Sequence, residues 1–144
     1  MAHPEFDCRL RRLNWPRSAK EQRFIDGARM VLVNGLSANA AAAMVPASRD
    51  AVRLRCIRIA SVRLADSKPT YYIYMASRQR CLGFRKTLAG ARRVRRAALL
   101  VREWLRRPKY VGRFLYAETE DVALYVAEPD GRFGRLGVVG IQQC

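Results

Sequence analysis

Histidine is nearly absent from the sequence, which has His3 alone, and the four cysteines lie far apart. No Cys-x-x-Cys pair, the spacing typical of structural zinc sites, occurs among Cys8, Cys56, Cys81 and Cys144. The scarcity of these ligands argues against a metal site and against Cys-His nucleophilic catalysis. We expect the cysteines to be buried thiols in a reducing compartment, with Cys144 exposed at the C-terminus.

Long apolar runs are also missing. No stretch approaches the roughly 18 to 20 apolar residues that a membrane-spanning helix requires. The opening "MAHPEFDCRLRR" lacks the apolar segment of a signal peptide. We therefore expect a cytoplasmic protein with no membrane partner.

Acidic residues are scarce beside basic ones: 12 Asp and Glu stand against 28 Lys and Arg, which gives a formal net charge of +16 over 144 residues. This excess favours a polyanionic partner, and nucleic acid is the one we expect, so that the protein associates with the nucleoid. Because 50% of the residues are hydrophobic, the chain can still bury a core, in one ordinary domain or two small ones.

Several carboxylates gather near the C-terminal end, at Glu118, Glu120, Asp121, Glu128 and Asp130. A metal-dependent nuclease needs such groups, but no histidine or lysine accompanies them in a recognisable pattern. The Pro-Asp-Gly turn already accounts for Asp130. We expect a solvated hairpin rim, in a protein that is not an enzyme and needs no cofactor.

Three helices are predicted in a domain over residues 18–65, after an irregular basic arm over residues 1–17. Each helix follows a serine that can cap it, at Ser18, Ser37 and Ser48. Asn34-Gly35 ends the first helix, and Pro46 ends the second, which runs from about Ala38 to Val45. The third, "RDAVRLRCIRIA", carries an apolar stripe at Val52, Cys56 and Ile59.

The second and third predicted helices, joined by a short turn, are typical of a helix-turn-helix. Ala41 or Ala42 supplies the small residue that a close helix contact needs. The start of the third helix would then reach base edges in the major groove, where an arginine can bind guanine through two hydrogen bonds. We expect base contacts from Ser48, Arg49, Asp50 and Arg53, and phosphate contacts from Arg55 and Arg58.

Residues 28–59, "ARMVLVNGLSANAAAAMVPASRDAVRLRCIRI", resemble the TrfB/KorA family of plasmid transcriptional repressors. The resemblance implies repression through operator DNA, bound as a homodimer, and it places on the recognition helix Ser48, Arg49, Arg53, Leu54 and Arg58. Leu54 thereby joins the expected base-reading residues. Pro46 stands where the family usually carries a glycine, and because proline cannot take a positive φ, we expect a different or longer turn.

The second half is predicted to be a small β-α-β-β-β domain over residues 71–144, after a linker at 66–70, which makes the chain an α+β protein. Its strands are expected at 71–76, 110–118, 121–128 and 132–141, and its helix from about Thr87 to Arg107. Such a domain would serve self-association or bind a protein partner.

The predicted helix of the second half is strongly basic. Between Arg78 and Arg113 there are thirteen basic residues and one acid, Glu103, which is too one-sided for ion pairing along the helix. We expect phosphate contacts from Arg92, Arg93, Arg95 and Arg96. The neighbouring Tyr71, Tyr72 and Tyr74 either pack against this helix, the interpretation that we favour, or form a base-stacking platform.

These patterns predict a sequence-specific DNA-binding protein, a transcriptional repressor of a bacterium or mobile element that binds double-stranded DNA. An alternative is an RNA- or single-strand-binding accessory protein that uses the basic helix and the sheet aromatics. A second alternative is an adaptor or inhibitor whose basic face docks on an acidic protein.

Overall fold

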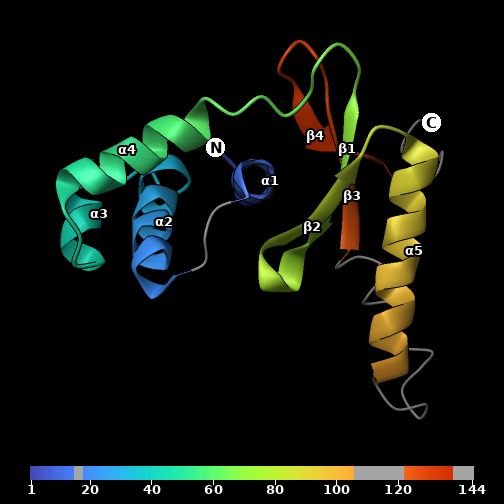
Figure 1. The fold of residues 1–144 in the computed structure, drawn as a ribbon, viewed down its shortest axis with the longest axis horizontal. Helices are drawn as coiled ribbons and strands as arrows, with labels where there is room; N and C mark the ends of the chain where they lie inside the picture. The colour runs from blue at the N-terminus through green and yellow to red at the C-terminus, as the bar shows by residue number, and fades with distance from the viewer. Residues whose placement is uncertain (15–17, 106–121, 138–144) are drawn as a thin grey trace. The chain divides into compact units, whose positions relative to one another are not determined.

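The computed structural model describes residues 1–14, 18–105 and 122–137. The chain divides into two compact units, Met1–Arg63 and Leu64–Cys144. The described residues form five α-helices and a four-stranded antiparallel sheet, so the chain is an α+β protein (Figure 1). Helices α1 to α4 belong to the first unit, and the sheet and α5 belong to the second.

Serine caps set the starts of three helices in the first unit. These are α2 (Ala19–Leu32), α3 (Ala38–Met44) and α4 (Arg49–Ala60). The hydroxyl oxygens of Ser18, Ser37 and Ser48 each accept a hydrogen bond, at 3.1 Å, from the backbone N–H three residues on. Each cap satisfies one of the N–H groups that a helix start leaves unpaired, and the predicted capping serines are confirmed.

The turn between α3 and α4 is closed without a left-handed residue. The N–H of Ala47 donates to the carbonyl of Ala42 at 3.1 Å, and Val45 ends α3 with φ −107°. Among the described residues, positive φ occurs only at Asn14, Gly35, Gln79 and Gly131. Pro46 therefore fits the turn, because no positive φ is required there.

Helices α2, α3 and α4 meet closely around Gly27 of α2. A Cβ atom at Gly27 would lie 2.9 Å from Cγ2 of Val52 on α4 and 3.1 Å from Cγ2 of Val45 in the turn. Ala41 and Ala42 are buried on the facing side of α3, as small residues in a close contact must be. The core of this unit comprises Phe6, Ile25, Ala28, Ala41, Ala42, Val45, Val52, Cys56 and Ile59.

The prediction of an irregular arm at residues 1–17 is wrong for most of that segment. Residues His3–Leu13 form a helix, α1, with Pro4 in its first turn, where a missing N–H costs nothing. Phe6 is fully buried, and Leu10 and Leu13 pack against the same core at helical spacing. The buried carboxylate of Asp7 forms an ion pair with Arg29 of α2, which ties the two helices together.

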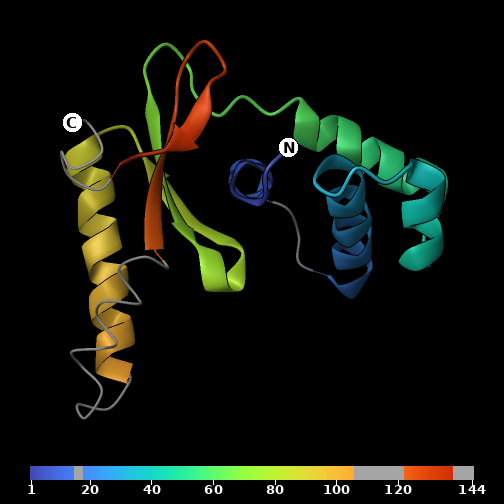
Figure 2. The same cartoon turned by 180° about the vertical axis from the view of Figure 1, so that it is seen from behind.

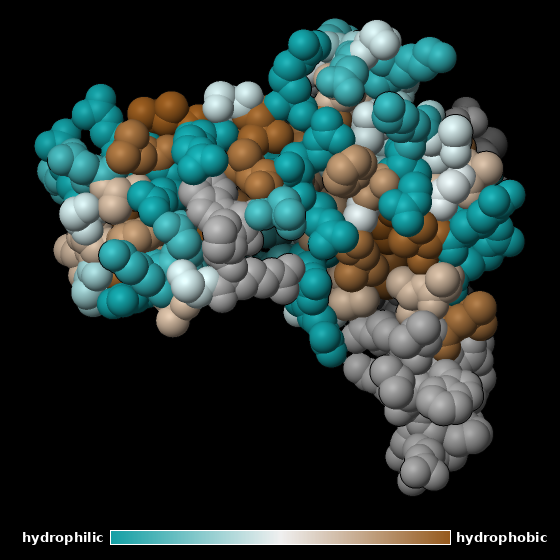
Figure 3. All heavy atoms as spheres, viewed as in Figure 1, coloured by the Kyte–Doolittle hydropathy of each residue, from teal (hydrophilic) through white to brown (hydrophobic). Residues whose placement is uncertain are grey.

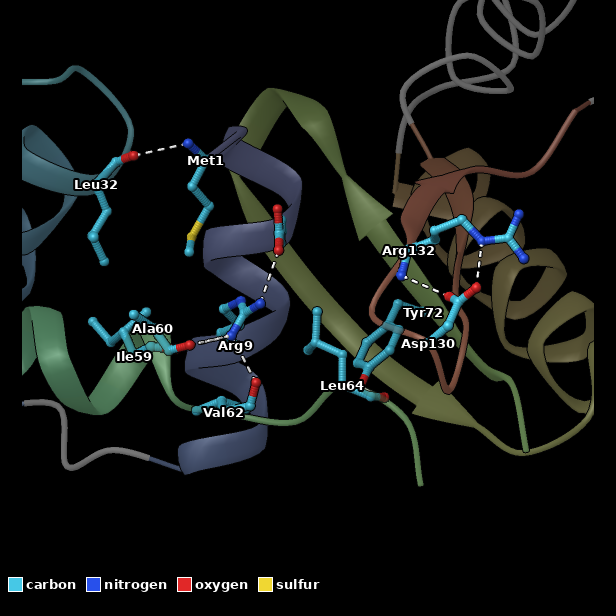
Figure 4. A network of polar contacts seen from close by, with 11 residues as sticks. Met1, Arg9, Leu32, Ile59, Ala60, Val62, Leu64, Tyr72, Asp130 and Arg132 are labelled. Atoms are coloured by element: carbon cyan, nitrogen blue, oxygen red, sulfur yellow. Dashed lines mark hydrogen bonds and ion pairs between the residues drawn. The ribbon is translucent and has the colours of Figure 1, made fainter. Parts of the chain in front are cut away.

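Helix α1 also supplies a cap for the end of α4. Nη1 of Arg9 donates to the carbonyl oxygens of Ile59, Ala60 and Val62, at 3.3, 2.9 and 2.7 Å (Figure 4). Glu5, one turn earlier on α1, accepts a hydrogen bond at its Oε1 from Nη2 of the same guanidinium at 2.9 Å. A cation at a helix C-terminus satisfies carbonyls that lack helical partners and opposes the negative end of the helix dipole.

The sheet of the second unit has the order β2-β1-β3-β4. Its strands are β1 (Thr70–Met75), β2 (Arg80–Arg85), β3 (Val122–Ala127) and β4 (Phe133–Arg135). Strand β2 was not predicted, so the β-α-β-β-β order is corrected to β-β-α-β-β over the described residues. The expected strand at 110–118 lies outside them.

Two different turns join the hairpins of the sheet. Between β1 and β2 the chain makes a short 3-10 helix, η1 (Ala76–Arg78), and then a left-handed residue, Gln79, with φ 45°. Between β3 and β4 it uses the predicted Pro-Asp-Gly turn, in which Gly131 has φ +96° and Asp130 accepts the N–H of Arg132 at 3.0 Å. The first turn has no hairpin signature in the sequence, which is why β2 was missed.

Helix α5 (Leu88–Leu105) packs on one face of this sheet (Figures 1 and 2). Its first turn is capped by the hydroxyl of Thr87, which accepts the N–H of Gly90 at 3.1 Å. Ala91 and Val94 of the predicted apolar side meet a core made of Ile73, Met75, Val122 and Leu124. The predicted end of this helix, at residues 106 and 107, lies outside the described residues.

We expect Gly27→Ala to destabilise the first unit although alanine is the better helix former. The methyl group would overlap Val52, which is fully buried and cannot move aside, and overpacking costs about 1–3 kcal/mol against a helix-propensity gain of about 1 kcal/mol. Urea unfolding followed by circular dichroism measures the difference. In a Val52→Ala background the same change should be neutral or stabilising, and an unchanged loss there would contradict the contact.

Arg9→Met should lower the free energy of unfolding of the first unit by about 1–3 kcal/mol, because it leaves carbonyl groups at the end of α4 unpaired. Arg11→Met, on the exposed side of the same helix, is the matched control and should have little effect. Equal losses from the two substitutions would show that Arg9 does not cap α4.

Candidate nucleic-acid interface

Helix α4 has one buried side and one exposed side. Val52, Cys56 and Ile59 face the core, as predicted, and are at most 9% exposed. Ser48, the N-cap, is exposed. The exposed side carries the other expected base-reading residues and one expected phosphate contact, namely Arg49, Asp50, Arg53, Leu54 and Arg58.

Arg55 is a correction to the expected phosphate contacts. Its guanidinium forms an ion pair with Glu21 of α2 and lies 4.4 Å from the centre of the Phe24 ring. Four-fifths of the side chain is buried, since its exposed fraction is 20%. Arg55 therefore binds α4 to α2 and does not belong to the outward surface.

Most carboxylates of the first unit form ion pairs with partly buried arginines of the same unit. Glu5 binds Arg9, Asp7 binds Arg29 and Glu21 binds Arg55, so three of the unit's five acids are in internal ion pairs. Asp26 accepts a hydrogen bond from Gln22 on its own helix. The exposed side of α4, with Asp50 as its acid, thus keeps an excess of positive charge.

The cysteines of the described residues are buried thiols. Cys8, Cys56 and Cys81 are buried and free of disulfides, as expected, and Cys144 lies outside the described residues. Burial raises the pKa of the Cys56 thiol above its ordinary value, so this thiol stays neutral in the core of the first unit. Within residues 1–14, 18–105 and 122–137, no group of three His, Cys, Asp or Glu side chains could hold a metal ion.

Arg92, Arg93 and Arg96 of α5 are exposed, but Arg95 is not a surface residue of the same kind. Nε of Arg95 donates to the carbonyl of Val122 at 2.7 Å, across the contact between α5 and β3. Burial, together with the charge of Arg135, lowers the pKa of its guanidinium. The expected phosphate contact of Arg95 is therefore corrected to a contact with the sheet.

The aromatic residues lie mainly on the sheet face opposite α5. Tyr72 meets Phe84 and Phe133, with ring centres 5.6 and 6.2 Å apart, and Tyr125 stacks on Phe133. Tyr72 and Tyr74 are 0% and 3% exposed. The favoured expectation that they pack against the basic helix is wrong, because only Tyr71 of the three packs with the core under α5.

A base-stacking platform also finds no support in this cluster. The ring of Tyr72 is enclosed, and its hydroxyl donates to the carbonyl of Leu64 (Figure 4). A base needs an exposed ring face on which to stack. The aromatic cluster and the exposed arginines of α5 lie on opposite sides of the sheet, so they do not form one binding surface.

The expected acidic rim is described in part. Asp130 and Arg132 form an exposed ion pair at 2.8 Å, and the hydrogen bond from the N–H of Arg132 lowers the pKa of the Asp130 carboxyl. Glu128, just before the turn, is described as well. Glu118, Glu120 and Asp121 lie outside the described residues.

No protein-family model, curated protein or solved structure matches this chain. The resemblance of residues 28–59 to the TrfB/KorA family therefore stays a prediction from the sequence. No helix of the described ranges is long and apolar enough to span a bilayer.

One residue on the exposed side of α4 was missed. Ile57 is 56% exposed, beside Leu54 at 57%, although both are large apolar side chains. The signal was available, because Ile57 falls outside the stripe of Val52, Cys56 and Ile59 that the helical spacing defines.

Unfolding measurements on variants can distinguish Arg95, which contacts the sheet, from the exposed Arg96. Arg95→Met should lower the free energy of unfolding of the second unit by about 1–2 kcal/mol, because the carbonyl of Val122 loses its donor. The exposed neighbour gives the matched control, Arg96→Met, which should change stability by less than about 0.5 kcal/mol. Thermal unfolding measures both, and a reversed order would refute the assignment of Arg95 to the sheet.

Proposed function

We propose that this protein binds double-stranded DNA in a sequence-specific manner and represses transcription, with α3, the turn and α4 acting as a helix-turn-helix. The observation that carries the proposal is the orientation of α4. Its apolar stripe is held against α2 and α3, so that Arg49, Arg53 and Arg58 project from the other side. Arginines in the first turns of a recognition helix, as Arg49 and Arg53 are here, read base edges.

The size of α4 suits the major groove. Its 12 residues span about 18 Å at a rise of about 1.5 Å each, and the groove is about 12 Å wide. Arg49 lies in the first turn, where side chains approach base edges, and Arg53 follows one turn later. Arg58, near the end of the helix, suits a phosphate.

In this proposal α5 provides affinity without sequence information. Arg92, Arg93 and Arg96 are exposed on one helix, and a row of cations at helical spacing can track phosphates. Arg55 and Arg95 take no part, because each is bound within its own unit. The second unit would also serve self-association or recruit a protein partner.

The family resemblance supplies the biological setting of the proposal: a repressor of a plasmid or other mobile element in the bacterial cytoplasm, bound to its operator as a homodimer. No cofactor is required for this activity. Of the alternatives, RNA or single-strand binding through aromatics is weakened by the burial of Tyr72 and Tyr74. The adaptor alternative predicts no nucleic-acid binding at physiological salt.

Substitutions of the arginines of α4 should reduce sequence discrimination, whereas substitutions of the arginines of α5 should reduce affinity for every DNA sequence. Arg49→Ala or Arg53→Ala should reduce discrimination between a selected duplex and random DNA by about 1–3 kcal/mol, because each removes contacts to a base. Arg93→Ala or Arg96→Ala should weaken binding to both, and each should lower the slope of log K against log salt by about 1. Fluorescence anisotropy at several salt concentrations measures both quantities.

The wild-type competition between duplex DNA, single-stranded DNA and structured RNA is the control for these variants. Equal loss on every sequence from all four substitutions would remove base reading from α4. Preference for RNA or single strands would favour the accessory-protein alternative, and no binding to any nucleic acid would favour the adaptor.

A further inference from the structure

The outermost line of α4 is apolar. Leu54 and Ile57 are 57% and 56% exposed, and each lies two residues from a member of the buried stripe, Val52 or Ile59. At about 100° per residue, two residues turn about 200° around a helix, so Leu54 points almost directly away from the core, and Ile57 lies about 60° around the helix from it. Figure 3 shows apolar side chains at the surface over α4, among hydrophilic ones.

Arginines border this apolar line on both sides. Arg49 and Arg53 lie on the side of the helix next to Ile57, in one row at four-residue spacing, and Arg58 lies on the other side, one turn after Leu54. The exposed face of α4 therefore carries a short apolar strip, Leu54 and Ile57, with arginines on both sides and Asp50 one turn before Leu54. Leu54 and Ile57 lie three residues apart on this face and form one small apolar patch, which a partner at the exposed side of α4 would cover.

We propose that Leu54 and Ile57 read thymine, by packing on its C5 methyl group in the major groove. This methyl is the apolar feature among the base edges of that groove, and it suits side chains that cannot form hydrogen bonds. The flanking arginines then bind guanine edges and phosphates. The inference rests on the proposed function and adds the kind of base that the centre of α4 selects.

The charge of this face favours DNA, and not a second copy of this chain, as the partner that covers Leu54 and Ile57. If two α4 helices packed on each other across a two-fold axis, Arg49, Arg53 and Arg58 of both copies would come together, with Asp50 as the acid available on that face. Like charges at an interface are unfavourable. A duplex presents phosphates on both sides of the groove, which complement the arginines on both sides of the strip.

Thymine-to-uracil replacement tests this inference, because it removes the methyl group and leaves the hydrogen-bonding edges unchanged. A preferred duplex is first selected from a random library with the full chain, and its thymines are then replaced one at a time. At the thymines that face α4, the wild-type protein should lose about fourfold in affinity for each methyl, as expected for burial of one such group.

Alanine variants show which side chain is responsible for the preference for thymine at each position. Leu54→Ala should abolish the thymine preference at one position and Ile57→Ala at another, while the remaining positions keep it. Leu100→Ala removes an equally exposed apolar side chain, 63% exposed, from α5 and should leave every preference intact. All three sites are exposed, and alanine is a good helix former, so the variants should fold.

The outcomes separate this inference from the proposed function. If the protein selects a duplex but no uracil replacement changes its affinity, thymine reading is overturned while DNA binding stands. If it selects no duplex at all, the proposed function fails. If Leu54→Ala and Ile57→Ala instead lower the mass in solution, measured by light scattering, the strip is a protein interface and the inference is wrong.

Discussion

The close approach of α2 and α4 at Gly27 determines which side of α4 faces solvent. With no side chain at Gly27, Val52 can reach the backbone of α2, and any Cβ there would lie within 3 Å of it. That contact sets the rotation of α4 about its own axis, and Cys56 and Ile59 follow into the core at helical spacing. The arginines and the apolar strip of α4 point outward as a consequence.

The arginines of the first unit fall into two groups that differ in their partners. Arg9, Arg29 and Arg55 each bind a carboxylate of the same unit, and each connects its own helix to another one: α1 to the end of α4, α2 to α1, and α4 to α2. Because the acids are used in this way, the outward side of α4 stays positively charged. The basic first unit keeps its helices packed because three of its five carboxylates, Glu5, Asp7 and Glu21, form internal ion pairs with arginines.

Features that depend on neighbouring residues could be predicted from the sequence, whereas contacts between residues far apart in the sequence could not. The capping serines, the end of α3 and the stripe of Val52, Cys56 and Ile59 depend on neighbours within one or two turns, so residue types and spacing predict them. Helix α1 was missed because Pro4 and its charges hid an amphipathic pattern, and β2 was missed because its turn uses Gln79 in a left-handed conformation. The roles of Arg55 and Arg95 depend on groups 34 and 27 residues away, which no local pattern reveals.

The second unit separates its two conspicuous features, aromatic residues and basic charge. Antiparallel pairing puts alternate residues of β1 on opposite faces, so Tyr71 packs under α5 whereas Tyr72 and Tyr74 join the cluster on the other face. Stacking of bases needs rings and cations on one accessible surface, and that arrangement is not met here. The exposed charges of α5 that the structure describes include Arg92, Arg93 and Arg96, and such charges attract any phosphate backbone alike. In the proposed complex with DNA, discrimination between sequences would therefore come from the first unit, where arginines and apolar side chains share the exposed side of one helix.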